Sequence, residues 1–106
     1  MPKSYKIKYT RLAREDLLNI FGYVALDLAA AQSAIKLLDN LETAILRLKD
    51  YPYSSPEARD KYLAEQGYRT LLCAKYLIFY KVNTKKHLVL IHRVIYSSRN
   101  LRWLFD

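Results

Sequence analysis

The sequence predicts an α+β fold in which an antiparallel, twisted sheet carries an α-helical hairpin on one face. Three largely apolar runs, at residues 68–73, 76–82 and 88–96, favour a strand meander. They are short, rich in branched and aromatic side chains, and separated by polar breaks. Ahead of them, apolar residues recur at helical spacing over a stretch of about forty residues. One straight helix of that length would be ~60 Å long, so a hairpin is expected, with a single bent helix as the alternative.

An additional strand is predicted at residues 3–9, where apolar and polar side chains alternate. The alternation places Tyr5, Ile7 and Tyr9 on one side and Ser4, Lys6 and Lys8 on the other. A period of two with one cationic face is typical of a half-exposed strand. We expect this strand to join an edge of the meander, where lysine discourages the addition of further strands.

The limits of the two long helices follow from capping residues. Thr10 is a suitable N-cap for the first helix, because its hydroxyl can accept a hydrogen bond from a free amide of the first turn. Asp16 is expected near the positive end of that helix. The first helix is predicted to end near residues 25–27, and Asp27 to cap a second helix that runs from residue 28 or 30 to residue 49.

A proline- and serine-rich break at residues 51–56 separates the hairpin from the meander. Ser55 as N-cap and Pro56 at the first helical position predict a short helix over residues 57–66. Gly67 is expected to end it in the left-handed conformation.

Composition restricts the class of protein. With 106 residues, of which 52% are hydrophobic, the chain is expected to form a single domain over residues 1–106. A single cysteine, Cys73, excludes an internal disulfide and suits a reducing compartment. No apolar run reaches the ~18 residues of a membrane span, so a cytoplasmic protein without membrane contact is expected. With two histidines and two glycines, the sequence suggests neither a metal site nor a cofactor.

Charge is the strongest functional signal in the sequence. Residues 66–105 carry eight cations and no acid, whereas residues 15–65 carry nine acids and five cations. Cations held together in a sheet without internal partners repel one another unless an anionic partner is expected. We therefore predict a basic sheet that recognises an acidic target. The candidate target- or RNA-binding residues are Lys75, Lys81, His92, Arg93 and Arg102.

The C-terminal tail is apolar and needs cover. Its large side chains are Leu101, Trp103, Leu104 and Phe105. We expect the tail either to pack on this domain as a last helical turn or to be covered by a partner.

The order of these elements resembles the RelE/ParE superfamily of bacterial toxins along nearly the whole chain. The matching segments are YKIKYTRLAREDLLNIFGYV, LETAILRLKDYP, GYRTLLCAKYLIFYKV and HRVIYSSRN. The family closes with an Arg-Asp pair, which here is Arg99-Asn100. An amide therefore stands where the family has the acid.

The resemblance implies a growth-inhibiting toxin, of a kind linked to plasmid stabilisation, that a cognate antitoxin wraps and silences. RelE-like members cut mRNA in the ribosomal A site, whereas ParE-like members act on DNA gyrase and lack nuclease activity. The long hairpin and residues 94–100 are closer to the ParE branch. The leading hypothesis is a ParE-like block of gyrase. The alternatives are a RelE-like mRNA endonuclease acting with the ribosome and, from charge alone, a non-toxic nucleic-acid-binding module.

If the chain is RelE-like, the resemblance places catalytic roles on Arg69, Tyr96 and Arg99. Metal-free RNA cleavage needs a base, a cation at the phosphate and an acid. Strand alternation predicts His92, Val94 and Tyr96 on one face of the last strand and Arg93 on the other.

Each candidate also has a structural alternative. Tyr96 can be a packing aromatic and His92 an ordinary core or surface histidine. Arg69 can hold the connector, which is the segment between the hairpin and the meander, or it can pair with a nearby acid. Arg93 can anchor the acidic helical layer.

Overall fold

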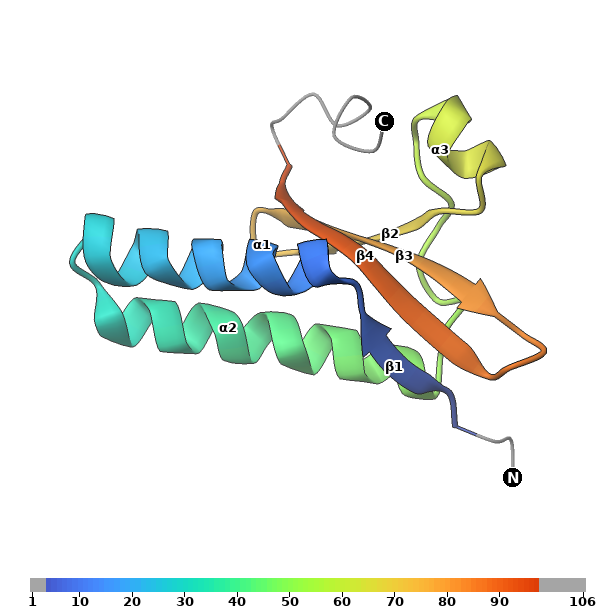
Figure 1. The fold of residues 1–106 in the computed structure, drawn as a ribbon, viewed down its shortest axis with the longest axis horizontal. Helices are drawn as coiled ribbons and strands as arrows, with labels where there is room; N and C mark the ends of the chain where they lie inside the picture. Colours follow the sequence, from blue (N-terminus) through green and yellow to red (C-terminus); the bar gives the residue numbers. More distant parts are fainter. Residues whose placement is uncertain (1–3, 98–106) are drawn as a thin grey trace.

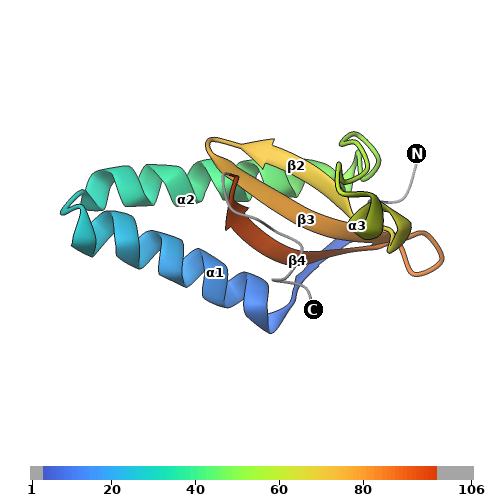
Figure 2. The same ribbon diagram turned by 90° about the horizontal axis from the view of Figure 1, so that it is seen from above.

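The computed structural model describes residues 4–97, which form a four-stranded sheet with two long helices on one face (Figure 1). The strands are β1 (Lys6–Tyr9), β2 (Arg69–Cys73), β3 (Tyr76–Asn83) and β4 (Leu88–Tyr96). The helices are α1 (Arg11–Gly22), α2 (Ala31–Leu46) and α3 (Lys61–Glu65), with a π-helical turn η1 (Tyr23–Asp27) after α1 and a 3-10 turn η2 (Arg47–Lys49) after α2. Figure 2 shows α1 and α2 side by side as a hairpin. The predicted α+β arrangement is confirmed.

The strand order is β1-β4-β3-β2, and it makes the sheet mixed. The meander of β2, β3 and β4 is antiparallel, as predicted. The expectation of an antiparallel sheet is wrong for β1, which joins the predicted edge but runs parallel to β4. Only a tight turn forces antiparallel pairing, and nearly the whole chain separates β1 from β4.

The main core lies between the helical hairpin and the sheet. Its buried residues are Ala13, Leu41, Ile45, Leu48, Ile78, Tyr80, Val89, Ile91 and Val94. The core residues of the helices recur at helical spacing and so lie on one face of the hairpin. Those of β3 and β4 lie on the face of the sheet that meets the hairpin. Ala13 is fully buried, and its small side chain lets α1 approach the sheet closely.

A second, smaller core lies on the opposite face of the sheet, under α3. It consists of Ala58, Leu63, Tyr68, Phe79 and Ile95. Because α3 is short, it covers only part of this face.

The connector before α3 differs from the prediction. The helix begins at Lys61 with Asp60 as its N-cap, so the expected start at Ser55 and Pro56 is wrong. Residues 56–58 instead pair with the chain around the start of β2, where Thr70 N donates to Pro56 O at 3.0 Å. Gly67 has a φ of 91°, which confirms the left-handed stop.

Of the two N-caps predicted for the hairpin, the structure has one. Thr10 Oγ1 accepts a hydrogen bond from Ala13 N at 3.0 Å, which confirms the N-cap of α1. The N-cap of α2 is Ala30, and Asp27 lies in η1, so the expected Asp27 cap is wrong. The chain reverses through Ala29, whose φ is 50°.

Removing one buried hydroxyl tests the packing of the connector on the sheet. Tyr80 is fully buried, and its hydroxyl donates to the Pro52 carbonyl at 2.9 Å. Because Tyr80→Phe leaves that carbonyl without its donor, we expect the unfolding free energy to fall by about 1–3 kcal/mol. Urea unfolding followed by circular dichroism measures the change. The control Tyr51→Phe alters a side chain that is 68% exposed, and equal stability of the two variants would contradict the prediction.

Candidate functional site

Two strands that are distant in sequence bring lysines to the face of the sheet opposite the hairpin. In the register of β1 with β4, Lys6 is the partner of Leu88 and Lys8 is the partner of Leu90. On the other side of β4, Lys81 is also the partner of Leu90. Paired residues point to the same side of a sheet. Lys8, Leu90 and Lys81 therefore form a row across three strands.

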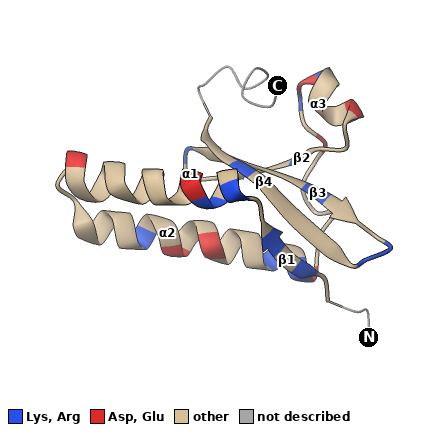
Figure 3. Cartoon of the chain, in the orientation of Figure 1, with Lys and Arg blue, Asp and Glu red and all other residues tan. Residues whose placement is uncertain are grey.

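A shallow groove of about 400 Å³ lies on β3, β4 and the turn between them. It is lined by Lys81, Val82, Asn83, Thr84, Lys85, Leu88, Leu90 and His92. We call these residues, together with Lys6 and Lys8, the basic groove. None of them is acidic. Figure 3 shows basic residues and no acidic ones on β1, on β3 and in the β3–β4 turn, whereas α1 and α2 carry both kinds.

His92 lies at the inner end of the basic groove because of a bulge in β4. Phe79 is the partner of Arg93, whereas the next residue, Tyr80, is the partner of Ile91, which leaves His92 as an extra residue. The expectation that His92, Val94 and Tyr96 share one face is therefore wrong: Val94 packs in the main core, whereas His92 contacts Tyr68 of the second core. An extra residue reverses the alternation, and sequence periodicity does not reveal it.

The surroundings of His92 favour its neutral form. Burial lowers the pKa of His92, and the nearby charge of Lys81 lowers it further. Nδ1 lies 3.3 Å from the Tyr68 hydroxyl, and Nε2 is buried without a hydrogen-bond partner in the described part of the chain. The Lys81 ammonium lies over the Tyr68 ring, 4.5 Å from its centroid. Burial also raises the pKa of Tyr68.

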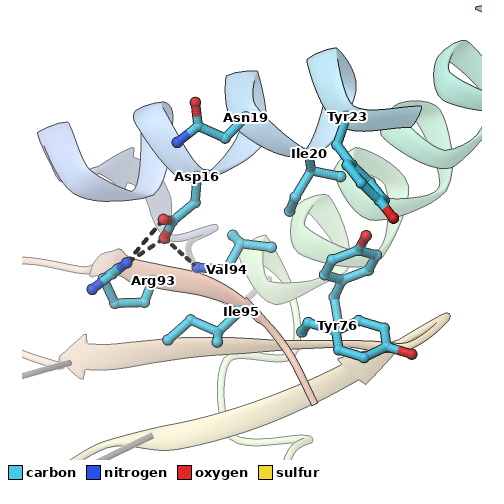
Figure 4. A pocket seen from close by; sticks show the side chains of 9 residues that line it. Asp16, Asn19, Ile20, Tyr23, Tyr76, Arg93, Val94 and Ile95 are labelled. Carbon is cyan, nitrogen blue, oxygen red and sulfur yellow. Dashed lines mark hydrogen bonds and ion pairs between the residues drawn. The ribbon is translucent and has the colours of Figure 1, made fainter. Parts of the chain in front are cut away.

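Arg93 anchors α1 to β4. Its Nε donates to Asp16 Oδ2 at 2.8 Å, and a second guanidinium nitrogen donates to Asp16 Oδ1 at 2.9 Å (Figure 4). Asp16 Oδ2 also accepts from Val94 N at 2.9 Å. The hydrogen bond from Arg93 to Asp16 raises the pKa of Arg93 further above its usual value. Asp16 thus lies in the second turn of α1, in the N-terminal half of the helix, and is engaged by β4.

A second concave region, the tyrosine cleft, lies between α1 and the ends of β3 and β4. It has a volume of about 650 Å³ and is lined by Asp16, Asn19, Ile20, Tyr23, Tyr76, Arg93, Val94, Ile95 and Tyr96. Figure 4 shows the Asp16–Arg93 pair at one end of the cleft, and Tyr23 and Tyr76 at the other. The rings of Tyr76 and Tyr96 pack edge to face at 5.7 Å.

Arg69 holds the connector. Its Nε donates to Ser55 O at 3.0 Å, and its guanidinium lies over the Tyr53 ring, 5.1 Å from the centroid. Arg69 is the β3 partner of Tyr80, whereas Tyr96 is the partner of Tyr76. Four residue steps along β3 separate these two positions, or about 13 Å. Arg69 thus lies level with the middle of β3, whereas Tyr96 lies level with its first residue.

The other residues singled out from the sequence fall in two groups. Lys75 is exposed in the turn between β2 and β3. Six lie outside the described residues, namely Arg99, Arg102, Leu101, Trp103, Leu104 and Phe105.

Sequence reasoning missed three residues that shape these surfaces. Lys6 and Lys8 were visible as the cationic face of a strand, but nothing local indicated that this strand pairs with β4. Asp16 was expected near the positive end of the first helix, but nothing local identified Arg93, 77 residues away, as its partner.

Within residues 4–97, no group of three or more His, Cys, Asp or Glu side chains could hold a metal ion. No helix in the same part of the chain is long and apolar enough to cross a membrane.

The solved structures that share this fold include two from toxin–antitoxin systems. The chromosomal ParDE TA system from P. aeruginosa aligns with a TM-score of 0.71 at 20% sequence identity, covering 90% of this chain and 98% of that chain. The toxin–antitoxin complex RelBE2 from Mycobacterium tuberculosis aligns with a TM-score of 0.61 at 19% sequence identity, covering 88% of this chain and 98% of that chain. No curated protein matches the sequence.

At these identities the two structures show that the chain shares their fold, a hairpin on a four-stranded mixed sheet. The family model for the ParE toxin of the type II toxin–antitoxin system parDE matches residues 7–101. The chain belongs to this ParE toxin family.

The Asp16–Arg93 pair is expected to stabilise the fold strongly. Only 14% of the Asp16 side chain and 16% of the Arg93 side chain are exposed. Asp16→Ala leaves a mostly buried guanidinium and the Val94 amide without their acceptor, so we expect the unfolding free energy to drop by about 2–4 kcal/mol. The matched control is Glu15→Ala on the same helix, whose pair with Arg11 is exposed and contributes at most about 0.5 kcal/mol. Equal losses in urea unfolding would argue against the anchor.

Stability should depend on pH through His92. Because its pKa is lower in the folded state than in the unfolded chain, the unfolded chain binds more protons as pH falls below about 6.5. We therefore expect the unfolding free energy to fall with pH in that range. The His92→Gln variant should show a smaller slope in urea unfolding at a series of pH values. An unchanged slope would mean that His92 titrates alike in both states.

Proposed function

We propose that this ParE-family chain stops growth by binding DNA gyrase and blocking it, and that a cognate antitoxin neutralises it. The matched family is described as the toxin of a type II toxin–antitoxin system, and both similar structures come from toxin–antitoxin systems by their titles. Those descriptions support an antitoxin as partner. The choice of gyrase rests on the ParE family and on the arrangement of the candidate catalytic residues.

The observation that carries the choice of binding over catalysis is the separation of Arg69 from Tyr96. A single scissile phosphate needs its cation and its proton-transfer groups within about 3 Å of the reacting atoms. Arg69 is the partner of Tyr80 and Tyr96 of Tyr76, about 13 Å apart along β3. Arg69 also gives its Nε to the connector and Arg93 gives its guanidinium to Asp16. This arrangement supports a surface that binds a protein target.

The basic groove is the proposed contact with the target, through Lys81 and His92. Lys75 lies at the opposite end of β3, in the β2–β3 turn, and would contribute a separate contact. Lysines on an exposed strand face can meet carboxylates without a fixed geometry, because the ammonium is a point charge on a flexible stem. The exposed pairs formed this way steer the encounter and weaken with salt.

Two assays on the purified chain separate the mechanisms. We expect inhibition of supercoiling by purified gyrase, and intact mRNA in a translation extract. Growth arrest on expression, relieved by the antitoxin, is expected in cells. A-site mRNA cuts without any effect on supercoiling would replace this proposal with the RelE-like one, and normal growth would remove the toxin function.

A tyrosine variant sharpens the distinction. Tyr96→Phe removes only a hydroxyl at the end of β4, so growth inhibition should stay within about 2-fold if the chain acts by binding. A nuclease that used this hydroxyl would lose ~10²-fold or more. Tyr23→Phe, on the opposite wall of the same cleft, is the matched control. Loss of toxicity with Tyr96→Phe but not with Tyr23→Phe would contradict the binding mechanism.

A further inference from the structure

The tip of the helical hairpin exposes several large apolar side chains. The two long helices extend past the end of the sheet, so the tip has no strand beneath it (Figure 1 and Figure 2). Leu18 is 72% exposed and Leu26 is 79% exposed. Leu28, close to the reversal of the chain, and Ile35 of α2 are also exposed. Single exposed leucines are ordinary, but several on one element indicate a contact surface.

Leu18 and Ile35 both lie on the outer face of the hairpin, away from the sheet. Leu18 follows Asp16 by two residues, so the two side chains point about 160° apart around α1. Asp16 accepts a hydrogen bond from the backbone of β4. Ile35 precedes Asn40 by five residues, or about 140° around α2, and the Asn40 carbonyl accepts from Cys73 of β2. Each apolar side chain therefore points away from a residue that meets a strand.

Gly22 makes a gap in this outer face. Leu18, Gly22 and Leu26 follow one another at four-residue spacing and so lie on nearly one line of the helix. A Cβ added at Gly22 would meet no atom within 4 Å, so the gap is open. Counted from the reversal at Ala29, Gly22 is about 10 Å along one helix and Ile35 is about 9 Å along the other. An isoleucine and an open gap thus lie at the same height on the two helices.

Opposite charges repeat this arrangement nearer the base of the hairpin. Arg14 and Glu42 are both exposed, and they lie about 22 Å and about 20 Å from Ala29 by the same count. Arg14 precedes Leu18 by one helical turn and Glu42 follows Ile35 by two, so each shares the outer face. Within residues 4–97, neither forms an ion pair. Rotation by 180° about the long axis of the hairpin exchanges the two helices, so the outer face is complementary to itself.

We propose that a second copy of this chain binds the outer face of the hairpin, and that the two hairpins form a symmetric four-helix bundle. In this dimer α1 of one copy lies antiparallel on α2 of the other, as neighbouring helices do in such bundles. Ile35 of each copy enters the gap at Gly22 of the other copy, and Arg14 pairs with Glu42. The basic groove lies on the far face of the sheet, so both copies keep it free and the proposal is independent of the target.

The size of the outer face fits a concentration-dependent dimer. Two helices side by side are about 20 Å wide, and the stretch from Arg14 to the reversal is about 22 Å long. The two faces together would bury about 900 Å², which is at the low end for specific interfaces. We therefore expect a Kd of roughly 1–100 μM.

Sedimentation equilibrium of the full chain over a range of about 1–300 μM tests the proposal. The average mass should rise from 12.5 kDa towards twice that value. Leu18→Gln should raise the Kd about 30-fold, because the symmetry removes two apolar contacts at once. The matched control Leu72→Gln alters a leucine of β2 that is 63% exposed, and its Kd should not change. A monomer at every concentration, or equal effects of the two substitutions, would overturn the proposal.

A glycine variant separates loss of contact from loss of folding. Gly22 has a helical φ of −60°, and leucine is a better helix former than glycine, so Gly22→Leu should not lower the unfolding temperature. Its Kd should nevertheless rise about 10-fold or more, because Ile35 of the other copy no longer finds the gap. Unchanged dimerisation of this variant would refute the packing of Ile35 against Gly22.

A charge exchange tests the symmetry directly. Arg14→Glu and Glu42→Arg each place like charges opposite one another twice in the dimer, so each variant alone should have a Kd about 10-fold higher. An equal mixture of the two variants regains both pairs of opposite charge, so heterodimers should form with about the Kd of the unaltered chain. A mixture that dimerises no better than its components would contradict the pairing of α1 with α2 across the two copies.

Discussion

The structure depends on the junction between α1 and the bulge in β4. Thr10 both caps α1 and donates its hydroxyl to His92 O at 2.8 Å. One turn and a half further along α1, Asp16 accepts from the Arg93 side chain and from the Val94 amide. Three consecutive residues of β4 are therefore held by one helix. A bulge interrupts the ladder hydrogen bonds, and these contacts from α1 replace part of what the ladder loses.

The bulge changes which face of the sheet the alternate side chains of β4 point to. Before it, Leu88 and Leu90 face the basic groove; after it, Val94 and Tyr96 face the hairpin and the tyrosine cleft. His92 is the residue at which the alternation changes. Without the extra residue, the aromatic end of β4 would turn away from α1, and the cleft would lose one wall.

The arginines and the lysines of the sheet have different roles. Arg69 and Arg93 use their guanidinium groups inside the fold, on connector carbonyls and on Asp16. The rigid, planar fork of arginine suits such fixed contacts, whereas the well-hydrated ammonium of lysine suits an exposed surface. The groove accordingly carries lysines. Charge alone had placed Arg69 and Arg93 in one recognition layer. Within the described residues, both arginines instead make hydrogen bonds inside the fold.

The sequence by itself determined the α+β class, the hairpin, the meander and the cap at Thr10, because each depends on local periodicity or on a single side chain near its backbone partner. The sequence motifs also pointed to the toxin superfamily. Only the tertiary structure decided that β1 runs parallel to β4, that Asp16 meets Arg93, and that Lys6 and Lys8 flank the leucines of β4. These facts join residues more than seventy positions apart, and the energy that selects them comes from packing the helices on the sheet, which leaves no local trace in the chain.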